Sequence, residues 1–279
     1  APREGYNEPF VRMNPLCRRL WHRLDQACDY WDLGDRAALG RHLQETYREF
    51  SGGAHSGVAR RVGHAHLDLV WLWPEAETER KAIHTFSTVL RLMEQDERFV
   101  FQHSSPWLFR RIASSQPELY REIEARIREG RWELSGALEL ESDVLLTSGE
   151  GLARNLRFGQ EFIRERTGDY ASLVWLPDVF GYPDCLPQLL RLSGARYFFT
   201  MKLSWSAITR FPHTAFRWSG SDGSEVLGYM SPTDYNGTGS LSETVEGVAL
   251  NRQAGLGVPS IMPTGYGDGG GGPTQEMLE

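Results

Sequence analysis

The stretch Gly63-His-Ala-His-Leu-Asp-Leu-Val-Trp-Leu-Trp-Pro74 decides the fold and the chemistry that the sequence predicts. It continues residues 58–62, whose alternating pattern predicts a β-strand, and it ends in a proline suited to the first turn of a helix. Because alternate side chains of a strand share a face, we expect His64, His66 and Asp68 to point the same way. Two imidazoles and a carboxylate together indicate a metal site. The alternative is that backbone groups and water satisfy them.

Aromatic residues follow this cluster directly. Trp71 and Trp73 offer flat apolar faces of the kind that stack on sugar rings. The stretch therefore predicts a pocket that combines metal ligands with aromatic walls.

Composition restricts the class of protein. The 279 residues are 40% hydrophobic and 24% charged, which favours one large α/β domain. A net charge of −7 without a long basic run argues against nucleic acid or an anionic membrane as the main partner. No apolar segment reaches the length of a bilayer span, so we expect a soluble protein. Three cysteines, Cys17, Cys28 and Cys185, leave one unpaired under any disulfide scheme, which favours a reducing cytoplasmic setting.

The chain is expected to have two parts. Residues 1–57 read as a polar lead-in, two helices over Pro15–Tyr30 and Arg36–Phe50 with Asp35 as a cap, and a Gly/Ser linker. Residues 58–279 then alternate between strand-like and helix-like segments and form the predicted catalytic domain. After the opening strand we expect, in order, a helix over Pro74–Glu94, a strand over Phe99–Gln102, two helices over Pro106–Glu129 broken at Pro117, a strand over Trp132–Ser135, a helix over Ser148–Arg166, a strand over Ser172–Trp175, a helix over Cys185–Ser193, a strand over Tyr197–Met201, an antiparallel pair of Ala215–Trp218 with Val226–Tyr229, a strand over Ser260–Thr264 and a helix that begins at Thr274.

This order predicts a mostly parallel sheet covered by helices, either open or closed into a barrel. In both architectures the active site lies at the carboxyl ends of the strands. His66, Asp68, Asp178 and Asp268 each follow a predicted strand. We therefore expect residues some 200 positions apart to meet at one rim.

A second motif, Trp175-Leu-Pro-Asp-Val-Phe-Gly-Tyr182, places Asp178 just beyond a strand. A carboxylate there can ligate a metal or attack an electrophilic carbon, and the alternative is a turn aspartate that binds nearby amides. The surrounding aromatic residues, Tyr182 among them, favour a pocket.

A third motif is the glycine-rich stretch Gly265–Gly272 around Asp268. It lacks the Lys-Ser/Thr of a phosphate-binding P-loop, so a nucleotide site is not predicted. The glycines allow the backbone to approach a ligand closely, unless the stretch is only a linker. Two carboxylates beside a metal suit glycoside hydrolysis, and they equally suit metal-assisted hydrolysis of an amide or ester.

Together these motifs, with Lys202-Leu-Ser-Trp205 and Phe211-Pro-His213, resemble the cytosolic and bacterial branch of the glycoside hydrolase family 38 α-mannosidases. The resemblance runs from about Val58 to the end of the chain. It implies a retaining exo-α-mannosidase built on a seven-stranded α/β barrel, with one divalent metal ion, Zn²⁺ or in this branch often Co²⁺. The implied substrate is a mannose-containing oligosaccharide. Homo-oligomerisation of the full-length protein is a further hypothesis.

The resemblance also implies roles for individual residues. His66, Asp68 and Asp178 resemble metal ligands, Asp178 also resembles the nucleophile, and Asp268 is the candidate general acid/base. His64 resembles a neighbour that orients the ligands. Substrate contacts are expected from Trp71, Trp73 and Tyr182.

The sequence departs from the family pattern between Gly136 and Glu150, where Glu139, Leu145 and Thr147 replace Trp, Asn and Pro, while Glu141 and Asp143 remain. This puts the linkage preference in doubt. The family's fourth ligand, a histidine, comes far beyond the glycine-rich loop, so the chain is expected to be an amino-terminal fragment that is inactive by itself. A metal-dependent carbohydrate deacetylase or amidase and a non-catalytic carbohydrate-binding relic are the alternative functions.

Overall fold

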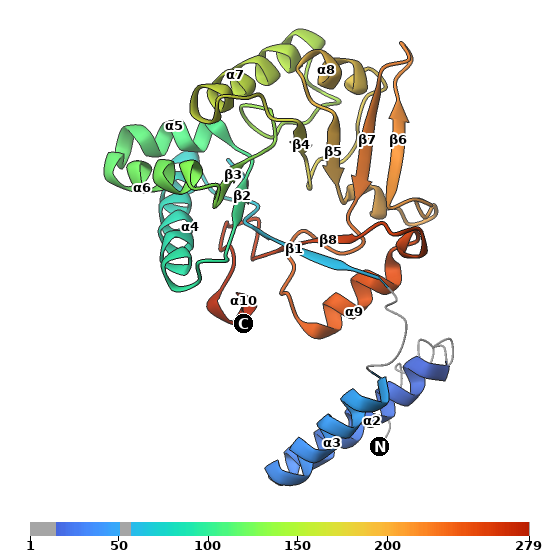
Figure 1. Cartoon of the computed structure of the whole chain (residues 1–279). Coiled ribbons are helices and arrows are strands. Elements are labelled where there is room, and N and C mark those ends of the chain that lie inside the picture. The colour runs from blue at the N-terminus through green and yellow to red at the C-terminus, as the bar shows by residue number, and fades with distance from the viewer. Residues whose placement is uncertain (1–14, 51–56, 279) are drawn as a thin grey trace. The chain divides into compact units, whose positions relative to one another are not determined.

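The computed structural model describes residues 15–50 and 57–278 (Figure 1). The chain divides into two compact units between residues 55 and 56. The predicted polar lead-in and most of the predicted linker lie outside the described residues.

The first unit is a pair of helices, α2 (Pro15–Asp32) and α3 (Arg36–Phe50). Asp35 caps the second helix as the sequence predicts, because its Oδ1 accepts a hydrogen bond from the backbone N–H of Ala38 at 2.9 Å. The buried His42 ring on α3 bonds the carbonyl oxygen of Arg23 on α2 at 2.7 Å. This hydrogen bond and the ion pair of Arg23 with Glu49 at 2.8 Å join the two helices.

The second unit is an α/β domain with two four-stranded sheets. One sheet has the order β3-β2-β1-β8 and is parallel throughout. The other has the order β4-β5-β7-β6, in which only the β6–β7 pair is antiparallel. The strands are β1 (Ala59–His64), β2 (Phe101–His103), β3 (Trp132–Leu134), β4 (Leu173–Trp175), β5 (Tyr197–Thr200), β6 (Ala215–Ser219), β7 (Glu225–Met230) and β8 (Ser260–Thr264). The predicted mostly parallel α/β fold and the predicted antiparallel pair are confirmed.

Helices surround the sheets in the order that the sequence predicts. Figure 1 shows α4, α5 and α6 beside β2 and β3, and α7 and α8 beside β4 and β5. They are α4 (Glu75–Gln95), α5 (Pro106–Ser115), α6 (Pro117–Arg128), α7 (Gly149–Thr167), α8 (Leu186–Leu192), α9 (Leu241–Leu250) and α10 (Gln275–Leu278), with 3-10 turns at Lys202–Ser204 and Ala254–Leu256. Pro117 begins a new helix, and the hydroxyl of Ser148 caps α7 by accepting the N–H of Gly151. The helix α9 is absent from the sequence-based expectation, because its apolar Leu241, Val245 and Leu250 are exposed and give no clear buried stripe.

One hydrophobic core runs from the first sheet and its helices to the second sheet, where it includes Val174 of β4 and Phe198 of β5. Phe86 of α4 stacks on Phe109 of α5 with 5.4 Å between ring centroids, and its ring meets that of Trp132 of β3 edge to face at 5.2 Å. All three side chains are buried. Burial of such large aromatic side chains is the main stabilising term in a domain of this kind.

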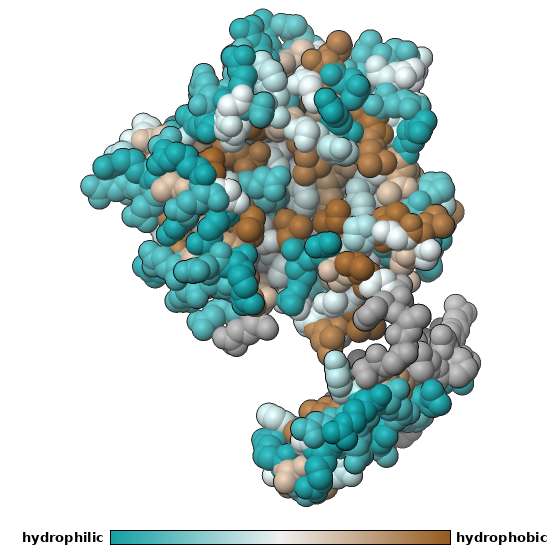
Figure 2. Space-filling view, viewed as in Figure 1, coloured by the Kyte–Doolittle hydropathy of each residue, from teal (hydrophilic) through white to brown (hydrophobic). Residues whose placement is uncertain are grey.

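Two sets of hydrogen bonds join the sheets. The backbone N–H of Gly136, just after β3, donates to the carbonyl of Leu173 in β4 at 3.1 Å. On the other side, the Tyr229 hydroxyl of β7 donates to the carbonyl of Pro259 and accepts the N–H of Ile261 in β8. The sheets therefore resemble two halves of an interrupted barrel. Between them Figure 2 shows exposed apolar side chains.

The first motif differs from its expected conformation. Strand β1 ends at His64, so His64, His66 and Asp68 do not lie on one face of a continuous strand. Instead, Leu67 forms an isolated antiparallel bridge with Gly269 of the glycine-rich loop. The chain leaves the sheet here, because the backbone of residues 67–68 pairs with the glycine-rich loop and not with a neighbouring parallel strand.

None of the helices within the described ranges combines the length and the apolar character that a membrane span requires.

Candidate active site

A cavity of about 530 Å³ opens at the carboxyl ends of the strands. It is lined by His66, Leu67, Asp68, Leu69, Trp71, Glu141, Ser142, Asp143, Asp178, Val179, Phe180, Lys202, Trp205, Tyr235 and Asp268. These residues follow strands β1, β3, β4, β5, β7 and β8. The rule that parallel strands bring the residues after their carboxyl ends together therefore accounts for the whole set.

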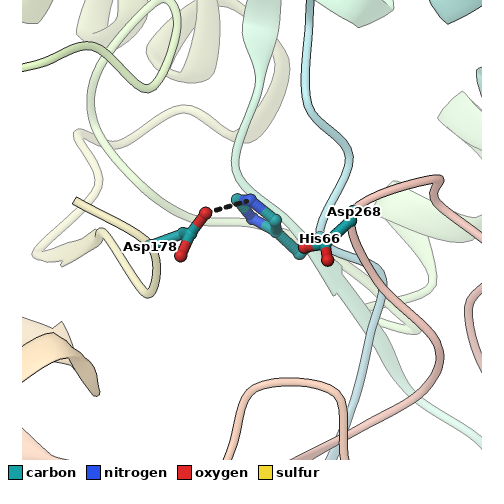
Figure 3. A group of neighbouring side chains, drawn as sticks. All are labelled: His66, Asp178 and Asp268. Atoms are coloured by element: carbon teal, nitrogen blue, oxygen red, sulfur yellow. Dashed lines mark ion pairs between the residues drawn. The ribbon is translucent and has the colours of Figure 1, made fainter. Parts of the chain in front are cut away.

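Three of the predicted site residues could hold a metal ion together. His66, Asp178 and Asp268 each offer one ligand atom, and these atoms all lie within 4.8 Å of one another. In Figure 3 the two aspartates lie on opposite sides of the His66 ring and come from different loops. The Nε2 atom of His66 is buried and has no hydrogen-bond partner, as expected for a nitrogen that faces an ion. One imidazole nitrogen with carboxylate oxygens is a donor set that suits zinc or a similar divalent ion.

Carboxylates surround the ring of His66. Its Nε2 lies 3.4 Å from Asp68 Oδ1 and 3.5 Å from Asp178 Oδ2, and its Nδ1 lies 3.6 Å from Glu141 Oε2. Burial by itself lowers the pKa of His66. The negative charges of Glu141, Asp178 and Asp68 outweigh burial and raise that pKa to about 10. The site is therefore built to hold positive charge at this nitrogen.

Asp178 is held from both sides. One oxygen, Oδ1, pairs with the ammonium of Lys202, which is almost fully buried, and the other faces His66. Burial raises the pKa of Asp178, but hydrogen bonding to His66 and Lys202 outweighs it and holds the pKa below its usual value. Asp178 is thus an ionised carboxylate at neutral pH.

Asp268 sits at a tight turn of the glycine-rich loop. Its φ of 57° lies in the left-handed region, and its Oδ1 accepts a hydrogen bond from the Tyr235 hydroxyl at 2.8 Å. Its carbonyl oxygen accepts the backbone N–H of Asp68 at 3.0 Å. A Cβ on Gly265 would lie 2.1 Å from the carbonyl oxygen of His64. Glycine there lets the loop pack directly against the first motif.

Trp71 is the one predicted substrate-binding residue that lines the cavity, and its side chain is exposed. Trp73 does not line it, because its ring meets Trp71 edge to face and its Nε1–H donates to Thr78 on α4. Tyr182 does not line it either. Its hydroxyl donates to the carbonyl of Leu176 and bonds the hydroxyl of Thr200, and its ring meets that of Phe198 edge to face at 4.8 Å.

His64 lies in the domain interior. Its Nδ1 bonds the side-chain amide of Gln102 at 2.9 Å, and its ring lies 5.2 Å from that of Trp175. Burial and the neighbouring histidines lower its pKa well below the usual value, so the ring is neutral. This hydrogen bond follows from the strand register, because His64 of β1 is paired with Gln102 of β2, and it leads away from the ligands.

The structure adds polar residues to the predicted set, of which Glu141, Lys202 and Tyr235 contact the predicted site residues. Glu141 and Lys202 belong to motifs noted in the sequence, but their spacing along the chain did not predict their contacts with Asp178. Tyr235 lies in a polar loop after β7, and only its contact with Asp268 reveals it.

Curated relatives of the chain carry α-mannosidase names. The chain is 41% identical over 229 residues to Alpha-mannosidase 2C1 of Homo sapiens, which covers 82% of this chain and 22% of the relative. It is 38% identical over 220 residues to the Alpha-mannosidase of Saccharomyces cerevisiae, with 78% and 20% covered. The chain thus spans about a fifth of the length of these relatives.

Solved structures share the fold. An alpha-mannosidase from Enterococcus faecalis V583 superimposes with a TM-score of 0.60 at 21% identity, over 77% of this chain and 25% of that one. A 4-alpha-glucanotransferase from Thermococcus litoralis gives 0.57 at 14% identity, over 76% and 34%. At these identities the likeness concerns the fold alone.

Residues 58–279 match the model of the glycosyl hydrolases family 38 N-terminal domain, which is the whole second unit apart from its first two residues. The cavity, its acidic residues and the sequence relatives agree with that match, and the chain belongs to this family.

Proposed function

We propose that this chain supplies the catalytic site of a metal-dependent retaining glycoside hydrolase that releases mannose from non-reducing α-mannosides. The observation that carries the proposal is the convergence of Asp178, Asp268 and His66 in one cavity. Family membership and the names of the relatives supply the substrate class.

Asp178 is the proposed nucleophile. Its ionised carboxylate attacks the anomeric carbon, the bond from that carbon to the leaving oxygen breaks, and Asp268 gives its proton to that oxygen. Water, deprotonated by Asp268, then cleaves the glycosyl ester. The ligand oxygens of the two aspartates lie within 4.8 Å of each other. This supports retention, for which the carboxyl groups are about 5–5.5 Å apart, against about 6.5–9.5 Å in inverting enzymes.

His66, Asp68 and Asp178 would hold one divalent ion, which we propose to be Zn²⁺ or Co²⁺. When bound, the ion supplies Lewis acidity and a binding point for the sugar's 2- and 3-hydroxyl groups. His66 and the ammonium of Lys202 offset the charge of Asp178 and so keep its carboxylate in place. Asp68 faces the same Nε2 of His66 as Asp178 does, which supports its role as a ligand beside Asp268 as acid/base.

Aromatic side chains would bind the sugar. Trp71 lines the cavity, and the rings of Phe180 and Trp205 meet edge to face at 5.7 Å on its wall. Their apolar faces suit the C–H surface of a mannose ring.

The test is hydrolysis of an aryl α-mannoside by the zinc-loaded full-length protein that contains this chain, with Asp178→Asn beside it. We expect turnover in the wild type and a loss of at least about 10³-fold in the variant, because covalent catalysis needs the carboxylate. Asp184→Asn is the matched control, since Asp184 lies in the same connecting segment, is exposed and does not line the cavity. If the protein binds zinc but cleaves no α-mannoside, the proposal fails, and a metal-dependent deacetylase or a carbohydrate-binding role takes its place.

Two further points are proposals. The low number of cysteines, of which Cys28 and Cys185 are free, supports a cytoplasmic location. Homo-oligomerisation of the full-length protein is tested by light scattering.

A further inference from the structure

We infer that Glu141 is a positioning residue, which holds two proposed metal ligands at once: it fixes the ring of His66 through Nδ1 and the Asp178 loop through its backbone N–H. The inference rests on the proposed function, because it concerns the same site. Glu141 itself would touch neither the ion nor the sugar through these contacts.

The first contact sets the orientation of His66. Glu141 Oε2 lies 3.6 Å from Nδ1, on the side of the ring opposite to Nε2, which faces Asp68 and Asp178. A carboxylate accepts hydrogen bonds and donates none when ionised, so it favours a proton on Nδ1. With the proton there, Nε2 offers its lone pair toward the two aspartates. A carboxylate behind a metal-binding histidine commonly has this effect.

The second contact sets the position of Asp178. Glu141 Oε1 accepts the backbone N–H of Asp178 at 3.2 Å. Since Asp178 follows β4 and His66 follows β1, one side chain ties together loops that belong to different sheets. The distance between the two ligands therefore depends on Glu141.

The neighbouring acidic residues do not share this role. Glu139 pairs with Arg110 at 3.0 Å, and Asp143 accepts the N–H groups of Leu145 and Leu146 within its own turn. Among the described residues, Glu141 has no ion pair with a lysine or an arginine, and its ion-pair partner is His66. Its carboxyl group is thus directed at the site.

The backbone beside Glu141 is held firmly. On α7, the side chain of Asn155 accepts the N–H of Leu140 at 3.1 Å and donates to its carbonyl at 3.0 Å. The carbonyl of Asn155 accepts the N–H of Glu139 at 2.9 Å. Three hydrogen bonds from one helical residue fix the segment from which Glu141 reaches the ligands.

The experiment uses the full-length protein and compares zinc affinity in wild type, Glu141→Gln, Glu141→Asp and the matched control Glu139→Gln, by competition with a chromogenic chelator. Glu141→Gln keeps the size and can still accept the N–H of Asp178, but it turns an amide N–H₂ toward His66 Nδ1. We expect its zinc affinity to fall about 10–100-fold, as for other residues that orient metal ligands. Glu139→Gln is expected to bind zinc like the wild type.

A second readout separates orientation from folding. In the zinc-loaded wild type, ¹⁵N NMR is expected to show His66 protonated at Nδ1, and thermal unfolding without zinc is expected to be alike in wild type and Glu141→Gln. Wild-type zinc affinity in Glu141→Gln would overturn the inference. If that variant does not fold, Glu141→Asp decides, since a shortened side chain that binds zinc like the wild type also overturns it.

These outcomes remain distinct from those for the proposed function. Zinc binding that depends on Glu141 in a protein without mannosidase activity supports the inference and contradicts the proposed function. A wild type that binds no zinc contradicts both.

Discussion

At the scale of single residues, the site holds more carboxylates than one metal ion needs. Asp68, Asp178 and Asp268 all approach the ring of His66, and the group whose possible ligand atoms all lie within 4.8 Å of one another contains Asp268 and not Asp68. Hydrogen bonding separates their roles. Asp268 Oδ1 is bound by the Tyr235 hydroxyl, whereas Asp68 Oδ1 faces Nε2 of His66.

This difference leads to a prediction for Asp68→Asn and Asp268→Asn. We expect Asp68→Asn to lower zinc affinity at least about tenfold, because an amide is a weaker ligand than a carboxylate. Asp268→Asn is expected to keep zinc and to lose turnover, because an amide donates no proton to the leaving group. Metal analysis after dialysis and aryl mannoside hydrolysis measure the two effects. If Asp268→Asn loses zinc and Asp68→Asn retains it, then Asp268 is the metal ligand and Asp68 is the candidate acid/base.

At the scale of elements, helix α7 fixes the position of the segment that follows β3. Gly159 allows this helix to approach the backbone of residues 137–139 closely. A Cβ on Gly159 would lie 2.3 Å from the carbonyl carbon of Leu138 and 2.4 Å from the carbonyl oxygen of Ala137. Ala137 itself has a φ of 61°, so the segment has little freedom to move away. Helix packing and the position of Glu141 are thus linked.

Gly159→Ala is therefore expected to destabilise the protein by about 3 kcal/mol, the upper part of the usual range for overpacking, because backbone atoms have to shift. The matched control is Gly149→Ala at the start of the same helix, where a Cβ meets nothing within 4 Å. Its effect is expected to stay below about 1 kcal/mol. Urea unfolding followed by circular dichroism measures both. Equal stability of the two variants would show that α7 has room to move.

At the scale of the whole α/β unit, stability depends on how the two sheets are joined. Tyr229 contributes a hydroxyl that donates to the carbonyl of Pro259 at 2.8 Å and accepts the N–H of Ile261 at 2.7 Å. Burial raises the pKa of Tyr229 to about 12, although the hydrogen bond from Ile261 opposes this. The folded protein therefore prefers the protonated phenol.

Tyr229→Phe is expected to cost about 1–3 kcal/mol at neutral pH, because it leaves a half-buried carbonyl and a half-buried N–H without this partner. The sign of the pH dependence follows from the raised pKa. The contribution of Tyr229 is complete below pH about 10, the value in the unfolded chain, and is lost as the pH rises toward 12. The stability difference between wild type and Tyr229→Phe is thus expected to shrink between pH 10 and 12 in urea unfolding. A difference that stays constant across this range would contradict the assignment to the phenol.

The order of strands and helices, the mostly parallel sheets and the rim at which His66, Asp68, Asp178 and Asp268 meet could be predicted from the amino-acid sequence. These follow from local periodicity and from the rule that parallel strands present their carboxyl ends on one side. Only the tertiary structure decided which atoms face one another. It paired His64 with Gln102 through the register of β1 and β2, and it brought Glu141 to His66 and Lys202 to Asp178. Such contacts join loops from different strands, and no spacing along the chain encodes them.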